Sequence, residues 1–372
     1  MIPVLVTGAG GFIGRNLCAA LRRLPDVEVV EYDVGTPRSV LEGALPRARV
    51  VYHLAGINRP VDPSEFETGN HGFTKELLGM IASAGARPRV VATSSTQAEL
   101  DNPYGRSKLA AEDELRAAAR DLGLEVLIYR LTNVFGKWCR PFYNSVIATF
   151  CYQTAHGEAL RVDDPAKEID FIYVDDVVRE FLSCLREEAP ESGGHAWRSV
   201  EPAYRRSLAD IVALLEGFRE SRRTASLPDF RDLFSKYLYS TYLSYLEPEA
   251  FIYAADKKVD ERGYLFELLK NPGFGQIFVS RTKPGVTRGN HYHHTKVEKF
   301  CVIEGSARVA FRDLNTQRTI SFDVTGQECR IIDIPPGWTH NITNTGGGEL
   351  LTLFWANEPF DAERPDTFFE KV

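Results

Sequence analysis

Runs of apolar residues alternate with helical segments through the first half of the chain. The stretch RNLCAALRRL (15–24) has the apolar spacing of an amphipathic helix. Near-continuous apolar strands separated by helices are typical of a parallel sheet that is covered on both faces. The pattern therefore predicts a doubly wound α/β domain. Its strands are expected at PVLVTG (3–8), VEVVEYD (27–33), ARVVYHLAG (48–56), RVVATSS (89–95) and LEVLIYRL (124–131).

From about residue 250 onward the pattern changes to short strands separated by Gly, Pro and Asn. Such strands at close spacing favour an antiparallel barrel or a double-sheet jelly roll. The change lies near SYLEPEAF (244–251), which predicts an α/β domain at residues 1–246 and an all-β domain at residues 247–372. The clearest strand patterns are GQIFVSR (275–281), EKFCVIEG (298–305), SARVAFRD (306–313), RTISFDV (318–324), CRIIDIP (329–335) and ELLTLFW (349–355).

Length and composition agree with a two-domain enzyme, since the chain has 372 residues and domains average about 150 residues. The net charge of −7 and the lack of a Lys/Arg run argue against a nucleic-acid partner. We recognise neither a signal peptide nor a membrane span in the sequence, and we therefore expect a cytoplasmic protein. Six cysteines without CxxC spacing indicate reduced thiols, to which we assign no chemistry: Cys18, Cys139, Cys151, Cys184, Cys301 and Cys329.

A glycine-rich turn follows the first predicted strand and opens the first predicted helix. Gly8, Gly11 and Gly14 have GxxGxxG spacing, not the GxGxxG spacing of the standard dinucleotide fingerprint. Glycine lets the backbone approach a pyrophosphate, whose charge then lies at the positive N-terminus of the helix. Such turns also occur without a ligand. Asp33, at the end of the second strand, is the type of carboxylate that binds the ribose hydroxyls of NAD and repels a 2′-phosphate.

Tyr104 and Lys108 lie four residues apart in NPYGRSKLAAE (102–112), which places them on one face of a helix. A lysine beside a tyrosine is expected to lower the pKa of the tyrosine, so that it exchanges a proton near neutral pH. Upstream, the strand ending in Ser94 and Ser95 offers hydroxyls for a substrate oxygen. A tyrosine and a lysine at this spacing are more often a surface pair. Here they follow the glycine-rich turn and the serine-bearing strand end, and these four parts in this order favour a dinucleotide-dependent site.

These motifs resemble the extended short-chain dehydrogenase/reductases that act on nucleotide sugars. The similarity runs through TGAGGFIG (7–14), HLAG (53–56), YGRSK (104–108), RLTNVFG (130–136) and DFIYVDDVV (170–178). The resemblance implies a Rossmann-type domain in which Tyr104 transfers the substrate proton and Lys108 holds the nicotinamide ribose. It implies that Ser95 orients the sugar oxygen, with Ser94 as a rival. The implied cofactor contacts are Gly8, Gly11, Phe12, Ile13, Gly14, Asp33, Leu54, Ala55, Gly56 and Lys108, and the implied substrate contacts are Asn133, Arg140 and Asn144.

The all-β domain carries two histidine motifs that fit a metal site. In GVTRGNHYHHTKVEKFCVIEG (285–305), His291 and His293 point to the same side of a strand, and Glu298 can reach the same ion from the adjoining strand. In IPPGWTHNITN (334–344), His340 is placed to complete a shell of three histidines and one carboxylate, which suits Zn²⁺ or another divalent transition metal. Both motifs together resemble the cupin superfamily. Flanking residues that offer a catalytic base remain alternatives: Tyr292, His294, Lys296 and Lys299.

The whole chain resembles a family of bifunctional enzymes of bacterial capsule and O-antigen synthesis, which act on the route to UDP-N-acetyl-L-fucosamine. The resemblance rests on the order of the two domains together with DNPYGRSK (101–108), FGKWCRPFYNSVIATFCY (135–152), LYSTYLSYL (238–246) and GNHYHHTKVEKF (289–300). The resemblance implies that the cupin epimerises C3 of UDP-2-acetamido-2,6-dideoxy-L-arabino-4-hexulose. The first domain then reduces C4 to give UDP-N-acetyl-6-deoxy-L-talosamine. We expect NADPH as the reductant, with NADH as the alternative because of Asp33, and a homodimer by analogy with other cupins.

Two other functions fit the same motifs. One is a redox-neutral epimerase or dehydratase that keeps NAD bound, with the cupin used only for dimerisation. The other treats the cupin as a metal-stabilised module that binds a partner or senses a sugar. Net oxidation of the nicotinamide cofactor and C3 exchange in histidine variants distinguish these alternatives.

Overall fold

The computed structural model describes residues 1–187, 193–251, 253–314, 316–328 and 330–372, so Cys329 lies outside the described residues. The chain divides into two compact units. The first comprises Met1–Leu215 and Tyr237–Leu246, and the second comprises Glu216–Lys236 and Glu247–Val372. The segment Glu216–Lys236 joins the second unit through two backbone hydrogen bonds. The Lys270 amide donates to the Ala225 carbonyl oxygen, and the Leu227 amide donates to the Lys270 carbonyl oxygen. This link between distant segments has no signature in the local sequence pattern.

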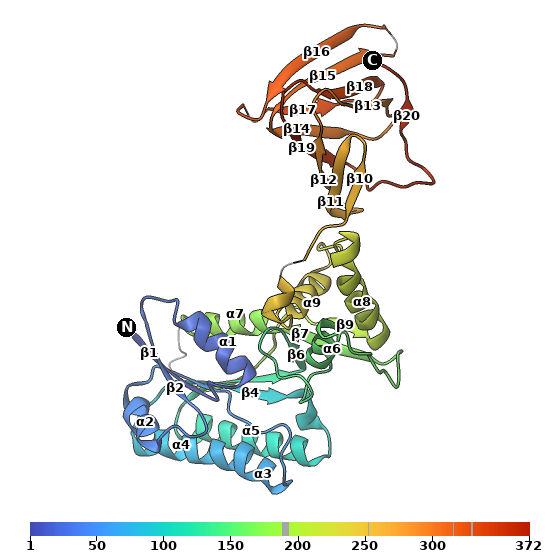
Figure 1. The fold of residues 1–372 in the computed structure, drawn as a ribbon. Coiled ribbons are helices and arrows are strands. Elements are labelled where there is room, and N and C mark those ends of the chain that lie inside the picture. Colours follow the sequence, from blue (N-terminus) through green and yellow to red (C-terminus); the bar gives the residue numbers. More distant parts are fainter. Residues whose placement is uncertain (188–192, 252, 315, 329) are drawn as a thin grey trace. The chain divides into compact units, whose positions relative to one another are not determined.

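A parallel sheet forms the centre of the first unit, and this confirms the predicted fold class. Among the described residues its strands lie in the order β2-β1-β3-β4-β5-β8, and every neighbouring pair is parallel (Figure 1). The chain passes from β1 to β2 on one side and then crosses to β3 on the other, so the topological switch point lies between β1 and β3. The bounds are β1 (Ile2–Thr7), β2 (Val27–Tyr32), β3 (Val50–His53), β4 (Arg89–Ser95), β5 (Glu125–Leu131) and β8 (Gly194–Arg198).

Helices cover both faces of this sheet because successive strand residues point to opposite sides. Val4 and Val6 of β1 face a core that includes α1 (Phe12–Leu21) and α7 (Val174–Cys184). Leu5 faces a second core with α2 (Arg38–Ala44), α4 (Phe73–Ser83) and α5 (Pro103–Asp121) (Figure 1). The short α3 (Ser64–Phe66) and the π-helical turn η2 (Glu67–Gly72) precede α4.

A smaller sheet and further helices complete the first part of the chain. Strand β7 pairs in parallel with β6 and antiparallel with β9. The remaining helices are α6, which begins after a Ser145 cap, and the later α8 and α9. The bounds are β6 (Asn133–Phe135), β7 (Glu168–Tyr173), β9 (Tyr204–Ser207), α6 (Val146–Ala155), α8 (Leu208–Thr224), α9 (Leu233–Leu243) and the 3₁₀ turns η1 (Leu45–Arg47), η3 (Thr96–Glu99) and η4 (Pro248–Phe251).

Two antiparallel sheets form the body of the second unit in its described part, a cupin-like arrangement that matches the predicted all-β region. One has the order β10-β11-β12-β19-β14-β17 and the other β16-β15-β18-β13-β20 (Figure 1). The bounds are β10 (Lys257–Asp260), β11 (Gly263–Asn271), β12 (Gly275–Thr282), β13 (Thr287–Tyr292), β14 (Glu298–Glu304), β15 (Ser306–Asp313), β16 (Thr319–Thr325), β17 (Ile331–Ile334), β18 (Trp338–Asn344), β19 (Leu350–Ala356) and β20 (Phe368–Phe369).

The core of the second unit lies between its two sheets. Phe300 of β14 and Phe354 of β19 come from one sheet, while Val309, Phe311 and Ile342 come from the other. These residues alternate with exposed or half-buried neighbours along each strand. The period of two that predicted strands here therefore also separates the core from the surface.

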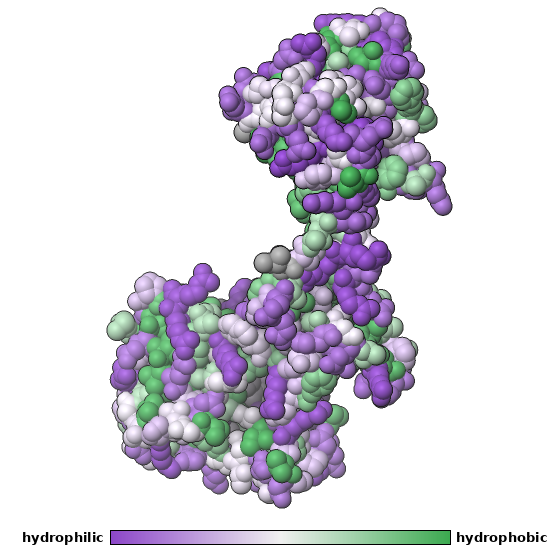
Figure 2. All heavy atoms as spheres, in the orientation of Figure 1, coloured by the Kyte–Doolittle hydropathy of each residue, from purple (hydrophilic) through white to green (hydrophobic). Residues whose placement is uncertain are grey.

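Polar and apolar side chains are interspersed on the face of the molecule that Figure 2 shows. Of the helices in the described part of the chain, none combines the length and the apolar composition needed to cross a bilayer.

Candidate active site and metal centre

A cavity of about 810 Å³ opens in the first unit at the carboxyl ends of its parallel strands. It is lined by the turn after β1, the segment after β3, the end of β4 and the residues that follow β5. In open α/β sheets ligands bind at this edge, beside the topological switch point. The cavity is therefore the expected place for a dinucleotide and its substrate.

The glycine turn leaves no room for side chains. A Cβ on Gly8 would lie 2.6 Å from the backbone nitrogen of Ala55, and Gly8 also has φ +70°. A Cβ on Gly14 would lie 2.1 Å from the carbonyl oxygen of Gly8. The turn leads into α1, whose N-cap is Gly11 and has no side-chain cap. Because the first amides of a helix have no partner within it, this helix end offers free N–H groups beside the glycine turn. This geometry suits a phosphate group.

Most of the predicted cofactor contacts line this cavity. The lining includes Gly8, Gly11, Phe12, Ile13, Gly14, Leu54, Gly56 and Lys108. Ala55 is outside the lining but supports the turn through its close backbone contact with Gly8. Asp33 also lies outside the lining, and its carboxylate accepts hydrogen bonds from the backbone amides of Gly10 (2.5 Å) and Val34 (2.7 Å).

Tyr104 and Lys108 are positioned by the first turns of α5. The helix begins at Pro103 behind Asn102, whose side chain accepts a 2.8 Å hydrogen bond from the Gly105 amide. Lys108 is buried, and its Nζ donates a 2.8 Å hydrogen bond to the carbonyl oxygen of Thr93 in β4. Burial lowers the pKa of Lys108 to about 8, although the nearby Glu112 carboxylate opposes this shift. Both Tyr104 and Lys108 line the cavity.

The prediction that Lys108 lowers the pKa of Tyr104 is wrong for the protein without cofactor. Burial raises the pKa of Tyr104, and a hydrogen bond with Ser95 lowers it by less, so the net pKa is raised. The interaction also distinguishes the two serines, because Ser95 contacts Tyr104 whereas the buried Ser94 hydroxyl has no hydrogen-bond partner among the described residues. Ser95 thus has the better geometry for orienting a substrate oxygen beside Tyr104.

The predicted substrate contacts Asn133, Arg140 and Asn144 also line the cavity. Sequence reasoning did not single out Trp138 and Tyr143, which lie in the same loop and line it as well. The Arg140 guanidinium lies 5.2 Å from the centre of the Tyr143 ring, and Trp138 has φ +68°. The aromatic residues in FGKWCRPFYNS (135–145) were the available signal, since a wall of flat rings suits a nucleobase or sugar.

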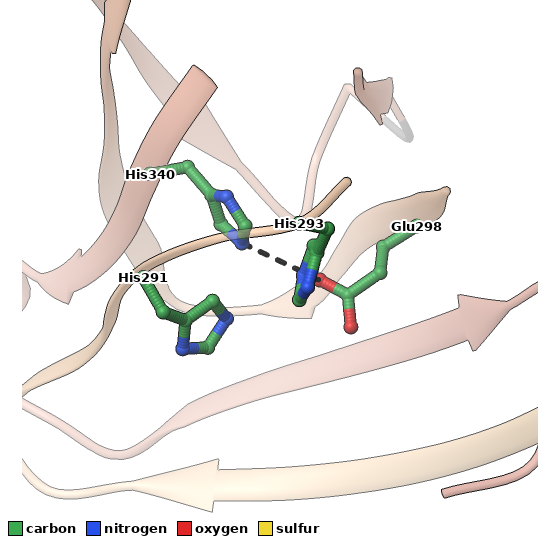
Figure 3. A group of neighbouring side chains, drawn as sticks. All are labelled: His291, His293, Glu298 and His340. Atoms are coloured by element: carbon green, nitrogen blue, oxygen red, sulfur yellow. Dashed lines mark hydrogen bonds and ion pairs between the residues drawn. The ribbon is translucent and has the colours of Figure 1, made fainter. Parts of the chain in front are cut away.

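A cluster of three imidazoles and one carboxylate lies inside the second unit (Figure 3). One ligand atom each from His291, His293, Glu298 and His340 lies within 4.8 Å of the other three. His291 is paired with His340 across β13 and β18, while His293 follows β13 directly. Glu298 Oε2 lies 3.2 Å from His293 Nε2 and 3.4 Å from His340 Nε2.

The strand that carries Glu298 differs from the expectation. The sequence pattern placed this residue on a strand adjoining His291 and His293, but β14 belongs to the opposite sheet. The hydrogen-bonded neighbours of β13 are β18 and β20. The cluster therefore spans the space between the two sheets, and His340 occupies the neighbouring strand instead.

The electrostatics of the cluster fit a divalent cation. Burial lowers the pKa of His291 to about 4, so its imidazole is neutral and able to donate a lone pair at neutral pH. Burial raises the pKa of Glu298, but His293 and His340 outweigh this effect and the net pKa falls to about 2. In the described structure His340 Nε2 is buried, meets no regular hydrogen-bond geometry and lies 3.4 Å from Glu298 Oε2. A buried nitrogen in this position beside a carboxylate suits Zn²⁺ or a similar ion.

The flanking residues that were alternatives for a catalytic base have partners of their own. Tyr292 stacks on Phe368 with ring centres 5.3 Å apart, and His294 contacts the same ring edge to face at 4.9 Å. Lys299 forms an ion pair with Asp333. Lys296 is buried and donates hydrogen bonds to the C-terminal segment.

Comparisons with known proteins agree with this two-part organisation. The NAD dependent epimerase/dehydratase family matches residues 4–197, and the polysaccharide biosynthesis C-terminal domain matches residues 258–368. The chain is 42% identical over 367 residues to the UDP-2-acetamido-2,6-beta-L-arabino-hexul-4-ose reductase of Pseudomonas aeruginosa strain PA103, which covers 99% of this chain and 98% of that protein.

Solved structures show the same relationship. The capsular polysaccharide assembling protein CapF from Staphylococcus aureus matches with 42% identity and a TM-score of 0.89 over 100% of both chains. The UDP-glucuronic acid 4-epimerase from Bacillus cereus, at 23% identity, matches 57% of this chain and 83% of that chain with a TM-score of 0.51. The latter likeness shows the fold alone.

The chain therefore belongs to the NAD dependent epimerase/dehydratase family and carries a polysaccharide biosynthesis C-terminal domain behind it. Membership confirms the prediction of an NAD(P)-dependent enzyme of the oxidoreductase and epimerase type.

Proposed function

We propose that the first unit reduces the C4 ketone of a UDP-linked 4-keto-6-deoxy sugar. The observation that carries this proposal is the group formed by Tyr104, Ser95 and Lys108 on the wall of one large cavity. When bound, NADPH supplies the hydride. Ser95 orients the carbonyl, and Tyr104 donates its proton to the oxygen as the C–H bond forms at C4. A raised pKa keeps Tyr104 protonated, which suits the reductive direction.

We propose that the second unit catalyses epimerisation at C3 before the reduction. A ketone at C4 acidifies the C3 hydrogen, and a divalent cation, when bound, supplies a Lewis acid that stabilises the enediolate. His291, His293, His340 and Glu298 would hold the ion. Reprotonation from the opposite face inverts C3, and reduction at C4 then removes the acidity and fixes the new configuration.

The substrate we propose is UDP-2-acetamido-2,6-dideoxy-L-arabino-4-hexulose, and the product is UDP-N-acetyl-6-deoxy-L-talosamine. The 42% identical relative is a reductase named for an arabino-hexul-4-ose UDP sugar, which supports this choice. CapF, a capsular polysaccharide assembling protein, supports a place in capsule or O-antigen synthesis, on the route to UDP-N-acetyl-L-fucosamine. We further propose residues 1–246 as the reductase domain, residues 247–372 as the metal-binding domain and a homodimer as the working form.

The choice of reductant rests on a balance between family resemblance and Asp33. We propose NADPH on the strength of the resemblance to the bifunctional enzymes. The Asp33 carboxylate favours NADH, since a negative charge at the end of the second strand repels a 2′-phosphate. Its two hydrogen bonds to the amides of Gly10 and Val34 fix the carboxylate near the glycine turn without neutralising its charge.

The test is incubation of the purified protein with the 4-keto UDP sugar in heavy water, with and without NADPH. We expect deuterium at C3 in both samples, and NADPH oxidation with reduction at C4 only when the cofactor is present. His291→Ala and His340→Ala should lose the C3 exchange while the protein remains folded. Absence of net cofactor oxidation would overturn the reductase and support the redox-neutral alternative, while full exchange in both histidine variants would overturn the epimerase and support a binding module.

A further inference from the structure

The C-terminal strap, defined as Pro365–Glu370, contacts the strand and the loop that carry two histidines of the metal cluster, although it lies about 70 positions further along the chain. Its strand β20 pairs with β13, so that Phe369 lies opposite His291. The amide of Glu370 donates a 2.9 Å hydrogen bond to the carbonyl oxygen of Asn290. The strap is thus joined to the strand that carries the first histidine of the cluster.

Asp366 binds the loop that carries the second histidine. Its carboxylate accepts hydrogen bonds from the backbone amides of His294 (3.0 Å), Thr295 (2.8 Å) and Lys296 (2.8 Å), and from the Thr295 hydroxyl (2.9 Å). Three consecutive amides converging on one carboxylate fix the backbone of this loop. Asp366 itself has φ +37°, a conformation that a non-glycine residue adopts only where its surroundings hold it.

The carbonyl oxygen of Asp366 completes the arrangement. It lies 2.7 Å from His293 Nδ1, and a carbonyl oxygen only accepts hydrogen bonds, so Nδ1 must carry the proton. Nδ1 is thus occupied, and Nε2 faces Glu298 Oε2 at 3.2 Å on the side of the cluster. When a cation is bound, Nε2 is the atom that can donate a lone pair to it. The strap therefore leaves Nε2, not Nδ1, as the ligand atom of His293.

Lys296 anchors the strap from the other side. Its ammonium group is buried and donates hydrogen bonds to the carbonyl oxygen of Pro365 (2.5 Å) and to the Thr367 hydroxyl (3.2 Å). The residues on both sides of Asp366 are thus held by the same loop that Asp366 binds. Loop and strap form one closed hydrogen-bonded unit, in which loss of the Asp366 carboxylate releases three amides at once.

We propose that Asp366 is a positioning residue for the metal centre, which fixes the loop after His293 and holds His293 in its Nδ1-protonated form. This inference rests on the proposed metal function. Outer partners of metal-bound histidines typically contribute about 10- to 100-fold to metal affinity. Asp366→Ala should therefore weaken binding of the ion about 10-fold or more, although Asp366 is not a ligand.

The first measurement is a Zn²⁺ titration of the full-length protein against a chromophoric chelator. Asp366→Ala is expected to bind Zn²⁺ at least about 10-fold more weakly than the wild type. Asp366→Asn, which keeps one acceptor oxygen, should fall between the two and serves if the alanine variant does not fold. Asp361→Ala is the matched control, because the described contacts of this exposed residue of the same tail are the Glu363 amide and the Arg364 guanidinium, both outside the strap.

The second measurement reads the tautomer directly, which a purely structural role would leave unchanged. Long-range ¹⁵N–¹H spectra of histidine-labelled, metal-free protein should show His293 protonated at Nδ1 in the wild type and in Asp361→Ala. Asp366→Ala keeps the backbone carbonyl but releases the three loop amides, so the strap should shift away from Nδ1 and a mixture of both tautomers should appear. Unchanged Zn²⁺ affinity together with an unchanged tautomer in both Asp366 variants would overturn the positioning role. A wild-type protein that binds no Zn²⁺ but keeps the predicted tautomer would instead overturn the metal function.

Discussion

The two sites are built in opposite ways. The glycine turn beside the cavity of the first unit depends on missing side chains, since a Cβ on Gly8 or Gly14 would meet backbone atoms, and the cavity offers about 810 Å³ for ligands. The cluster of the second unit owes its chemistry to side chains that are present, with four donor atoms within 4.8 Å of one another. The first site must be completed by a large cofactor, whereas the second is completed by a single ion.

This difference predicts that the two chemistries can be separated by single substitutions. The proton donor of the reduction and the ligands of the metal lie in different compact units with separate cores. A change within one site should leave the other chemically intact, even though both act on the same keto sugar. The following predictions test how complete that separation is.

The largest effect is expected for Tyr104→Phe, which removes the phenolic proton from the cavity. NADPH oxidation with the keto sugar should fall about 10³-fold, as expected for the loss of a general acid. Deuterium exchange at C3 should persist, because the metal cluster is unchanged. Stopped assays of cofactor oxidation and mass spectrometry of the sugar measure the two quantities.

Tyr253→Phe is the control for Tyr104→Phe, since Tyr253 is exposed and lies outside the cavity lining. Its reduction rate should equal that of the wild type. Parallel loss of exchange and reduction in Tyr104→Phe would contradict the separation of the two sites.

Removal of the ion should have the next largest effect. Dialysis against a chelator should lower C3 exchange at least about 10²-fold, because Lewis-acid stabilisation contributes several kcal/mol. Reduction of a ketone that is already epimerised should continue at the original rate. Addition of Zn²⁺ should restore exchange in the wild type but not in His340→Ala. His195→Ala, at an exposed position of β8, is the control for the loss of an imidazole. Restored exchange in His340→Ala would remove this residue from the ligand set.

A smaller effect is expected at the cofactor. Asp33→Asn keeps an oxygen to accept the Gly10 amide but removes the charge. The ratio of kcat/KM for NADPH to that for NADH should rise about tenfold, which corresponds to about 1.4 kcal/mol. Steady-state kinetics with both cofactors measures this ratio. The control is Asp26→Asn, at the residue directly before β2. An unchanged ratio would place Asp33 outside the cofactor site and leave only its hydrogen bonds to the glycine turn.

Much of the fold followed from hydrophobic periodicity, because four of the five predicted parallel strands, β1, β3, β4 and β5, are largely buried and have near-continuous apolar runs, while β2 is half-buried throughout. The pattern failed where burial is weak. Strand β8 has largely exposed or half-buried residues, so GHAWR carries no apolar signature. The docking of residues 216–236 on the second unit depends on backbone bonds to Lys270, which local sequence does not encode.

The candidate sites show the same limit. Residue spacing alone predicted that Tyr104 and Lys108 lie on one helix and that the two histidine motifs meet in one barrel. The net direction of the Tyr104 pKa could not be predicted, since it depends on burial by distant segments. The contact of Asp366 with His293 spans 73 positions and uses a backbone carbonyl, which has no residue signature at all.

A further effect is expected on the stability of the first unit through Lys108. Its pKa is about 8 in the folded protein and 10.5 in the unfolded chain, because burial disfavours the charged ammonium. Between these values the unfolded chain binds the extra proton, so the free energy of unfolding should rise with pH in this window, by less than about 1.4 kcal/mol per pH unit. Below pH 8 both states are protonated and the contribution no longer changes with pH.

Lys108→Met should remove this slope. Groups that titrate in both proteins cancel when the free energy of unfolding of the variant is subtracted from that of the wild type at each pH. Urea unfolding of cofactor-free protein from pH 7.5 to 10 measures it, with the exposed Lys167→Met as the control for loss of a lysine charge. An identical slope in wild type and Lys108→Met would mean that the ammonium stays charged in its buried position, held there by Glu112 and the Thr93 carbonyl.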